Sequence, residues 1–192
     1  MQVLDISFMV DEVVPSVYLS GIRPAQDPNR LRELGITHIV DISNTFPAPP
    51  NPAMPSVSVL RLGCRDVPEE NILIHMPKVF AFVDAALARG GKVLVHCVAG
   101  ISRSPTLVTA WIMKTAFASG AAITVEEALD TVQRARPYVQ PNEGFLFQLG
   151  LLETHRSVEA AIKAYEALAN SGQLFGGLPM TEGTRMSSCL LM

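Results

Sequence analysis

The segment from residue 92 to residue 106 places the strongest constraint on how this chain of 192 residues can fold. It begins with an apolar, β-branched stretch over 92–97, a composition typical of a buried core strand. A short loop containing Gly100 follows, and Arg103 lies just before a predicted helix whose early proline is tolerated in its first turn. The segment therefore predicts a core strand that delivers Cys97 into a loop at the N-terminal end of a helix.

Predicted strands and helices alternate along most of the chain. Three further segments have strand patterns, namely 17–20, 37–42 and 57–62. Helical patterns with capping or terminating residues lie at 29–34, 77–89, 104–118, 124–136 and 142–149. The proline-rich stretch 46–55 cannot enter regular structure and predicts a loop. This alternation places the chain in the α/β class.

The length corresponds to one domain with an appendage, at about 100–200 residues per domain. Beyond residue 155 the chain changes character, because 157–169 is alanine-rich and predicts a longer last helix. Residues 171–188 contain four glycines without hydrophobic periodicity, which predicts a flexible tail. We therefore expect a main domain over 13–155, followed by a helical extension and a flexible tail over 156–192.

Charge and cysteine usage exclude several classes of protein. The 15 Lys and Arg residues are outnumbered by 18 Asp and Glu residues and form no cluster, which argues against a nucleic-acid partner. No apolar run approaches the ~20 residues needed to cross a bilayer, and acids flank the first apolar stretch, unlike in a secretory signal. Cys64, Cys97 and Cys189 are scattered without metal-ligand spacing, so we expect a reduced, cytoplasmic location, no metal and no disulfide framework.

The loop after Cys97 has the features of an anion-binding nest. The backbone amides of residues 98–103 can turn inward around one anion, and the following helix adds a positive potential. Gly100 allows the loop to curl, and the planar guanidinium of Arg103 can grip two oxygens of a phosphate. The same field stabilises the thiolate form of Cys97, so the segment predicts a sulfur nucleophile aimed at phosphorus. The predicted phosphate-binding residues are Val98, Ala99, Gly100, Ile101, Ser102 and Arg103.

The pattern H-C-x-x-G-x-x-R-S over residues 96–104 resembles the signature of the cysteine-dependent protein tyrosine phosphatases, and the stretch AGISRSPT resembles their dual-specificity branch. The resemblance extends over about residues 13–152. It implies a protein-tyrosine-phosphatase-like fold, with a central mixed, mostly parallel sheet flanked by helices. It also implies hydrolysis of phosphoproteins through a phosphocysteine, without a cofactor or a metal. The length resembles that of the small, atypical members of this branch.

The resemblance assigns catalytic roles to residues around Cys97 and Arg103. Asp66, 31 residues before the cysteine, corresponds to the acid that protonates the leaving group. Glu69 and Glu70 are the competing candidates for this role. The hydroxyl of the serine after Arg103 is expected to bond the cysteine sulfur and also to cap the following helix. This serine is Ser104.

Three further residues lie close to these in the family pattern. His96 is expected to orient the loop through its ring nitrogens. Asn142 is expected to brace the phosphate loop, to cap the last helix, or to do both. Cys64 lies two positions before the proposed acid, and either it is a buried residue at a strand end or it forms a reversible disulfide with the nucleophile.

The substrate class follows from what the loop carries. Val98 and Ala99 are uncharged, whereas the phosphoinositide-selective relatives have lysines there, so inositol lipids are disfavoured. Nothing corresponds to the tyrosine-containing loop that deepens the pocket of phosphotyrosine-only enzymes. A shallow pocket would admit phosphoserine and phosphothreonine as well as phosphotyrosine. Two alternatives stay open, namely a catalytically weak relative that only binds phosphosites, and a phosphatase for a non-protein phosphate ester.

The last four residues, CLLM, match the C-a-a-X prenylation pattern, in which a terminal methionine favours farnesyl. Arg185 is the nearby basic residue, and no polybasic stretch accompanies it. One lipid chain alone holds a protein only weakly on a membrane. We therefore expect farnesylation of Cys189 to give partial membrane association of a monomeric protein, with pools in the cytoplasm and the nucleus.

Overall fold

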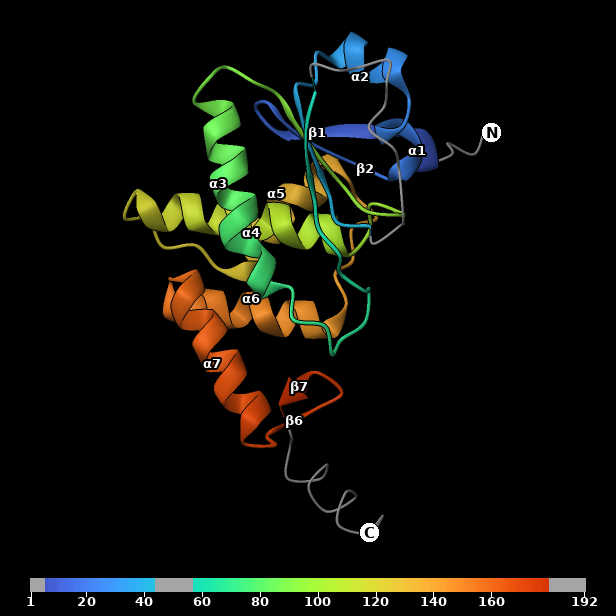
Figure 1. Cartoon of the computed structure of the whole chain (residues 1–192). Coiled ribbons are helices and arrows are strands. Elements are labelled where there is room, and N and C mark those ends of the chain that lie inside the picture. Colours follow the sequence, from blue (N-terminus) through green and yellow to red (C-terminus); the bar gives the residue numbers. More distant parts are fainter. Residues whose placement is uncertain (1–5, 44–56, 180–192) are drawn as a thin grey trace.

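The computed structural model describes residues 6–43 and 57–179 and is built on a five-stranded sheet (Figure 1). The strands follow the order β1 (Val10–Val14), β2 (Val17–Ser20), β5 (Val93–His96), β3 (His38–Asp41) and β4 (Ser58–Arg61). β1 pairs antiparallel with β2, and the other neighbouring strands are parallel. The sheet is therefore mixed and mostly parallel, which confirms the predicted α/β fold.

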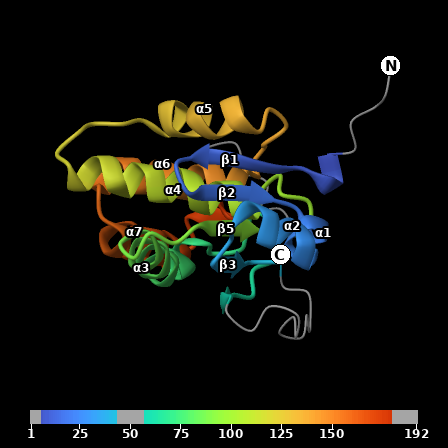
Figure 2. The same ribbon diagram turned by 90° about the horizontal axis from the view of Figure 1, so that it is seen from above.

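Helices cover both faces of this sheet, as the view from above shows (Figure 2). One face carries the short helices α1 (Ile22–Ala25) and α2 (Pro28–Leu34). The other carries the longer helices α3 (Met76–Leu87), α4 (Arg103–Ala118), α5 (Val125–Ala135) and α6 (Glu143–His155). Two 3-10 turns, η1 (Ile6–Phe8) and η2 (Leu73–His75), precede β1 and α3. The result is a three-layer arrangement with the sheet in the middle.

The alternation of side chains along the central strands explains why both faces need helices. Val93 and Val95 of β5 pack into the large core under α3, α4 and α6, whereas Leu94 between them belongs to a smaller core with α1 and α2. β2 behaves in the same way, since Leu19 enters the large core and Tyr18 the smaller one. A strand that is apolar on both faces can only be buried between two layers.

The helix ends follow the capping signals in the sequence. Thr124 and Glu127 form the predicted capping box at the start of α5. Asn142 begins α6, where its Oδ1 accepts a hydrogen bond from the Phe145 amide at 3.0 Å. α2 ends at Gly35, whose φ of 69° places it in the left-handed region. The predictions for these three helices are confirmed.

Three expectations differ from the structure. The last helix is not continuous through residue 169: α6 ends at His155, Arg156 adopts a φ of 51°, and Ser157 caps a separate helix α7 (Val158–Asn170). Part of the expected flexible tail is ordered, because β6 (Leu174–Phe175) and β7 (Leu178–Pro179) form a hairpin. The antiparallel strand β1 was not expected, because its sequence VDEVV places two acids in the middle of a short apolar stretch.

Several predicted features lie outside the described residues. These are the proline-rich segment over 46–55, the end of the tail beyond residue 179, and Cys189 with its prenylation pattern, so farnesylation stays a prediction. Among the helices that the structure describes, none is both long and apolar enough to cross a membrane.

Candidate active site

Strand β5, the central strand of the sheet, places Cys97 at its carboxyl end. β5 lies between β2 and β3 and is parallel to both, so its carboxyl end opens between theirs. Cys97 follows the last residue of β5 directly and is 1% exposed. The loop then rises into α4, whose first residue is Arg103. In open α/β sheets ligands bind in the crevice outside the carboxyl ends of such strands.

The loop between β5 and α4 has all of its carbonyl groups turned outward. Each carbonyl from residue 98 to residue 102 accepts a hydrogen bond: Val98 from the Ile22 amide (3.0 Å), Ala99 and Gly100 from the Arg136 guanidinium (3.2 and 2.8 Å), Ile101 from the Gln140 amide (2.8 Å) and Ser102 from the Thr106 amide (3.0 Å). In a trans peptide the N–H points opposite to the carbonyl. The amides of residues 99–103 are therefore directed into the loop, where they can bind an anion.

Two donors converge on the sulfur of Cys97. The Gly100 amide lies 3.2 Å from Sγ, and the Ser104 hydroxyl also lies 3.2 Å from it. The expected second role of Ser104 as the helix cap is wrong, because α4 begins one residue earlier and Ser102 occupies the cap position. The Ser104 side chain is thereby left to the sulfur, which suits a nucleophile that must later leave as a thiolate.

The guanidinium group of Arg103 is hydrogen-bonded to the protein through Nη1, whereas its Nε is left available for a ligand. Its Nη1 donates to the backbone carbonyls of Ser43 (2.9 Å) and Cys64 (3.1 Å). Its Nε is buried and has no hydrogen-bond partner within the described part of the chain, although Asp66 Oδ2 lies 3.4 Å away. A buried N–H without a partner costs free energy, so an oxygen of a bound phosphate would satisfy it.

The structure brings Asp66 to the same loop. Its Oδ1 accepts hydrogen bonds from the Ser102 hydroxyl (2.6 Å) and from Asn142 Nδ2 (3.0 Å). The backbone amide of Asn142 also donates to the Ser102 hydroxyl at 3.2 Å. Asn142 therefore contacts the loop at the side chain of Ser102 and not at the loop backbone. Asn142 therefore caps α6 with its Oδ1 and holds the acid with its Nδ2.

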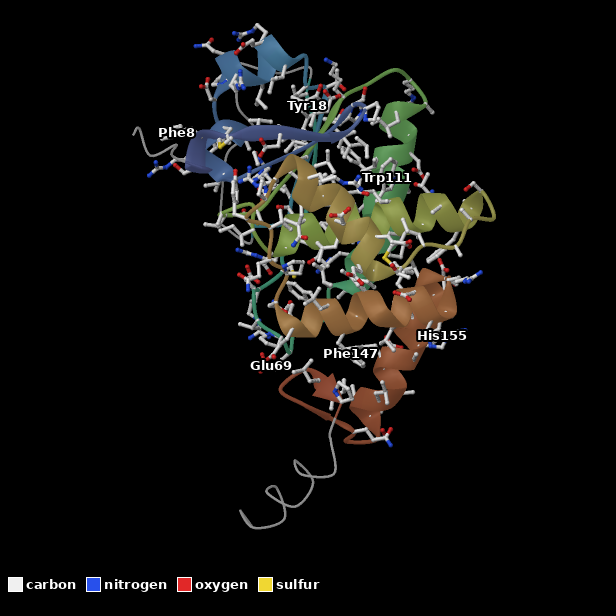
Figure 3. All side chains as sticks on the ribbon, turned by 180° about the vertical axis from the view of Figure 1, so that it is seen from behind. Phe8, Tyr18, Glu69, Trp111, Phe147 and His155 are labelled. Atoms are coloured by element: carbon white, nitrogen blue, oxygen red, sulfur yellow. The ribbon has the colours of Figure 1, made fainter. Side chains whose placement is uncertain are left out.

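The competing carboxylates point elsewhere. Glu70 forms an ion pair with Arg65, with 2.7 Å between Oε2 and Nε. Glu69 lies beside the β6–β7 hairpin in the view from behind (Figure 3), and its Oε1 approaches Gly176. Of the three candidate acids, the structure places only Asp66 against the loop.

His96 and Asp41, the last residues of β5 and β3, lie beside the start of the loop. His96 Nδ1 lies 3.3 Å from the Cys97 carbonyl, and its Nε2 lies 3.8 Å from Asp41 Oδ1. Burial lowers the pKa of His96, although the Asp41 carboxylate opposes this shift. The ring therefore serves as a neutral hydrogen-bonding group near pH 7.

Cys64 is fully buried, and its Sγ donates to the backbone carbonyl of Arg65 at 3.4 Å. Burial raises the pKa of this thiol to about 12, and the Glu70 carboxylate adds to the shift. The thiolate is the form that exchanges with disulfides. Full burial at the strand end fits the structural alternative, and the reversible disulfide with Cys97 stays a prediction.

Stability is expected to fall as the pH drops below about 6.5. Burial lowers the pKa of His38, His75 and His96 in the folded chain, whereas unfolded histidines titrate near 6.5. Between the folded and unfolded pKa values the unfolded chain binds more protons, so acid favours unfolding. Thermal unfolding from pH 7.5 to pH 5.5 measures this trend. A melting temperature that rises as the pH falls over this range would contradict it, and His96→Asn should reduce the dependence, with His38 and His75 supplying the rest.

Arg136 lies within the part of the chain that resembles the family, but no role at the site was predicted for it. Its side chain is fully buried, and its Nε and Nη2 hold the Gly100 and Ala99 carbonyls. Its Nη1 donates to Asp11 Oδ2 of β1 at 2.5 Å. These hydrogen-bond partners lie 36 residues or more away in the chain, so no local pattern predicts them. The guanidinium also lies over the ring of Tyr138, 4.5 Å from its centroid.

Comparisons with known proteins agree with this geometry. The family model "Dual specificity phosphatase, catalytic domain" matches residues 17–155. The chain is 38% identical over 142 residues to dual specificity protein phosphatase 12 of Rattus norvegicus, covering 74% of this chain and 40% of the relative. It is 35% identical over 145 residues to dual specificity protein phosphatase 22-B of Danio rerio, covering 76% of this chain and 74% of the relative.

A solved structure shows the same fold. The crystal structure of human DUSP28 is 33% identical, with a TM-score of 0.67, and the match covers 77% of this chain and 94% of that one. In contrast, the chain spans less than half the length of its rat relative, whose remaining part has no counterpart in the match.

Proposed function

The chain belongs to the dual-specificity phosphatase family, and on this premise we propose that it hydrolyses phosphotyrosine and phosphoserine or phosphothreonine in proteins through a phosphocysteine. The observation that carries the proposal is the loop after β5. Its carbonyls are bonded outward, its Gly100 amide donates to the Cys97 sulfur, and Arg103 Nε is buried without a hydrogen-bond partner among the described residues. Such a loop fits the doubly charged, tetrahedral group of a phosphate monoester.

In the first step the Cys97 sulfur attacks phosphorus. The S–P bond forms as the bond from phosphorus to the leaving oxygen breaks, and the loop amides and Arg103 hold the remaining oxygens. Asp66 protonates the leaving oxygen. Because its Oδ1 already accepts two hydrogen bonds, the proton is carried by Oδ2, the oxygen on the side of Arg103.

In the second step water attacks the phosphocysteine. Asp66, now ionised, takes a proton from the water, and the S–P bond breaks to release inorganic phosphate. The Ser104 hydroxyl, 3.2 Å from the sulfur, stabilises the departing thiolate. The residues named here supply every proton transfer of the cycle.

The rim of the loop supports protein substrates. Val98 is 44% exposed, and neither it nor Ala99 carries a charge. An apolar rim can pack against the phenyl ring of phosphotyrosine and does not exclude the shorter phosphoserine. It offers nothing to the additional phosphates of inositol lipids.

Turnover rather than simple phosphosite binding is supported by the acid. A binding module needs only the anion nest, whereas here Ser102 and Asn142 orient Asp66 beside Arg103 of the phosphate loop. Release of phosphate from phosphotyrosine and phosphothreonine peptides, in the presence of excess chelator, tests the proposal. Binding of the peptides without release, or release that requires added metal, would overturn it.

Asp66→Asn is expected to lower kcat/KM for an ester with a poor leaving group by on the order of 10², while an ester with a good leaving group loses far less. The amide keeps the hydrogen bond from Ser102 but has no proton to give. The same change should flatten the basic limb of the rate-against-pH profile. A series of aryl phosphates measures both effects. Glu69→Gln is the control, and the acid is misassigned if that variant shows these effects and Asp66→Asn does not.

A further inference from the structure

The C-terminal extension, residues 156–179, lies outside the matched catalytic domain and packs near the proposed acid. Figure 1 shows α7 and the β6–β7 hairpin on the far side of α6 from α4. α7 packs against α6, where the Tyr165 and Phe147 rings lie 6.4 Å apart. The extension also contacts η2, which follows the segment that carries Asp66. We call residues 66–71 the acid segment.

Three consecutive backbone carbonyl groups of the acid segment, those of residues 68–70, contact α6, α7 or the β6–β7 hairpin. Pro68 O lies so close to Gly144 of α6 and to Gly177 of the hairpin that a Cβ on either glycine would lie 2.0 Å from it. Glu69 O accepts a hydrogen bond from the Tyr165 hydroxyl of α7 at 3.4 Å. Glu70 O accepts one from Gln148 Nε2 of α6 at 2.8 Å.

Two of the four residues that contact these carbonyl groups belong to the extension. Gly144 and Gln148 belong to the matched domain, whereas Tyr165 and Gly177 do not. Tyr165 is 5% exposed, so its hydroxyl is fixed by packing and not by solvent. The glycine is required twice at position 177, because its φ is +80° and because Pro68 occupies the space where a side chain would begin.

The first of these contacts, at Pro68, is two residues along the chain from Asp66. Pro68 has a fixed φ and restricts the residue before it, so a shift at Pro68 is passed to Asp66 rather than absorbed between them. The Asp66 side chain is 36% exposed and is held by side-chain contacts to Ser102 and Arg103 of the loop and to Asn142 at the start of α6. Misplacement of a catalytic group by about 1 Å can cost on the order of 10² in rate.

The phosphate loop is held by different elements. Its carbonyls are bonded by Ile22 at the start of α1, by Arg136, by Gln140 and by α4. None of these donors belongs to the extension. A disturbance of the hairpin should therefore reach the acid without reaching the site that binds phosphate.

We propose that Tyr165 and Gly177 of the C-terminal extension are positioning residues that hold the acid segment so that Asp66 can protonate the leaving group. This inference rests on the proposed function. The extension touches neither substrate nor nucleophile and acts through the backbone of residues 68 and 69. The hairpin thus makes a segment outside the catalytic domain a determinant of which leaving groups the enzyme can expel.

The test compares two adjacent glycines in the full chain. Gly177→Ala introduces a Cβ against Pro68 O, whereas Gly176→Ala places one 3.6 Å from the end of the Glu69 side chain. Both positions have positive φ, +80° and +58°, so both variants carry similar backbone strain. Tyr165→Phe is a second, milder variant that keeps the packed ring and removes the hydroxyl.

The readout is kcat/KM for aryl phosphates of graded leaving-group ability, since this ratio includes the steps through leaving-group expulsion and excludes phosphocysteine hydrolysis. Gly177→Ala should lower the value for the poorest leaving group roughly tenfold and Tyr165→Phe should lower it by a smaller factor. The value for the best leaving group and the inhibition constant of inorganic phosphate should stay at the wild-type level. Gly176→Ala should match the wild type throughout.

Equal losses for all leaving groups, a weaker inhibition by phosphate, or the same effect from Gly176→Ala would overturn the proposal, as would unchanged profiles in Gly177→Ala and Tyr165→Phe. Thermal unfolding of each variant identifies a folding defect, and in that case Tyr165→Phe decides. Wild-type turnover of the best leaving group tests the proposed function separately, because it does not depend on the extension.

Discussion

Replacing Cys97 by serine is expected to abolish hydrolysis of phosphate esters, with a loss on the order of 10⁴ or more. A serine hydroxyl can still accept from the Gly100 amide and the Ser104 hydroxyl, which lie 3.2 Å from the sulfur. It stays un-ionised, however, and the adjacent His96 does not act as its base, because His96 directs Nδ1 to the Cys97 carbonyl at 3.3 Å. Turnover of an aryl phosphate and the inhibition constant of inorganic phosphate measure the result, and the latter should change little.

The control for this change is Cys64→Ser. Cys64 is equally buried, and a hydroxyl can take over its hydrogen bond to the Arg65 carbonyl. This variant should lose some stability and keep its turnover. An active Cys97→Ser enzyme would refute the phosphocysteine mechanism, and an inactive Cys64→Ser enzyme that is folded would show that Cys64 takes part in the chemistry.

Gly100→Ala is expected to cost at least on the order of 10² in kcat/KM for every substrate, whatever its leaving group. Gly100 has a φ of +71°, and a Cβ there would lie 2.5 Å from Ser20 O and 2.8 Å from Arg136 Nη2. The loop can relieve this contact only by moving its amides or by displacing Arg136. Both responses weaken the phosphate site, so inhibition by inorganic phosphate should weaken in parallel.

Gly120→Ala is the matched control. Gly120 has a φ of +79° and no heavy atom within 4 Å of the position of a Cβ. It therefore carries the same kind of backbone strain, about 1–2 kcal/mol, without the steric contact. Its turnover should equal that of the wild type. If Gly100→Ala also retained wild-type phosphate affinity, the loop would not have the rigidity inferred from its outward hydrogen bonds.

The parts of the site that are local in the chain could be predicted from sequence. Cys97, Gly100 and Arg103 lie within seven residues, and a single strand, loop and helix bring them together. Asp66 is distant, and its assignment came from the family resemblance and not from geometry. The structure now places it against Ser102 and Asn142, 36 and 76 residues away.

Arg136 and Gln148 show what sequence patterns miss. Each is a fully buried polar residue whose side chain bonds backbone groups far along the chain, and Arg136 also pairs with the Asp11 carboxylate. A backbone carbonyl leaves no mark in the sequence, so nothing local reveals that a side chain will bind one. Buried polar residues of this kind are recognised only once the fold supplies their partners.

The prediction of a flexible tail is wrong for residues 174–179, because glycine is common both in flexible segments and in tight turns. Four glycines without apolar periodicity over 171–188 are typical of a flexible segment. In the structure, Gly176 and Gly177 form the turn of the β6–β7 hairpin with positive φ. The packing partner that selects order over flexibility, Pro68, lies more than 100 residues earlier.

The ion pair between Arg136 and Asp11 joins a buried residue of the matched catalytic domain to a residue outside it. The matched catalytic domain begins at residue 17, and Asp11 lies before it, in the edge strand β1. A fragment cut at that boundary would leave a fully buried guanidinium without its counter-ion, at a cost of roughly 3–5 kcal/mol. That guanidinium also holds the Gly100 carbonyl, so we expect a fragment that begins at residue 17 to lose both stability and order in the phosphate loop.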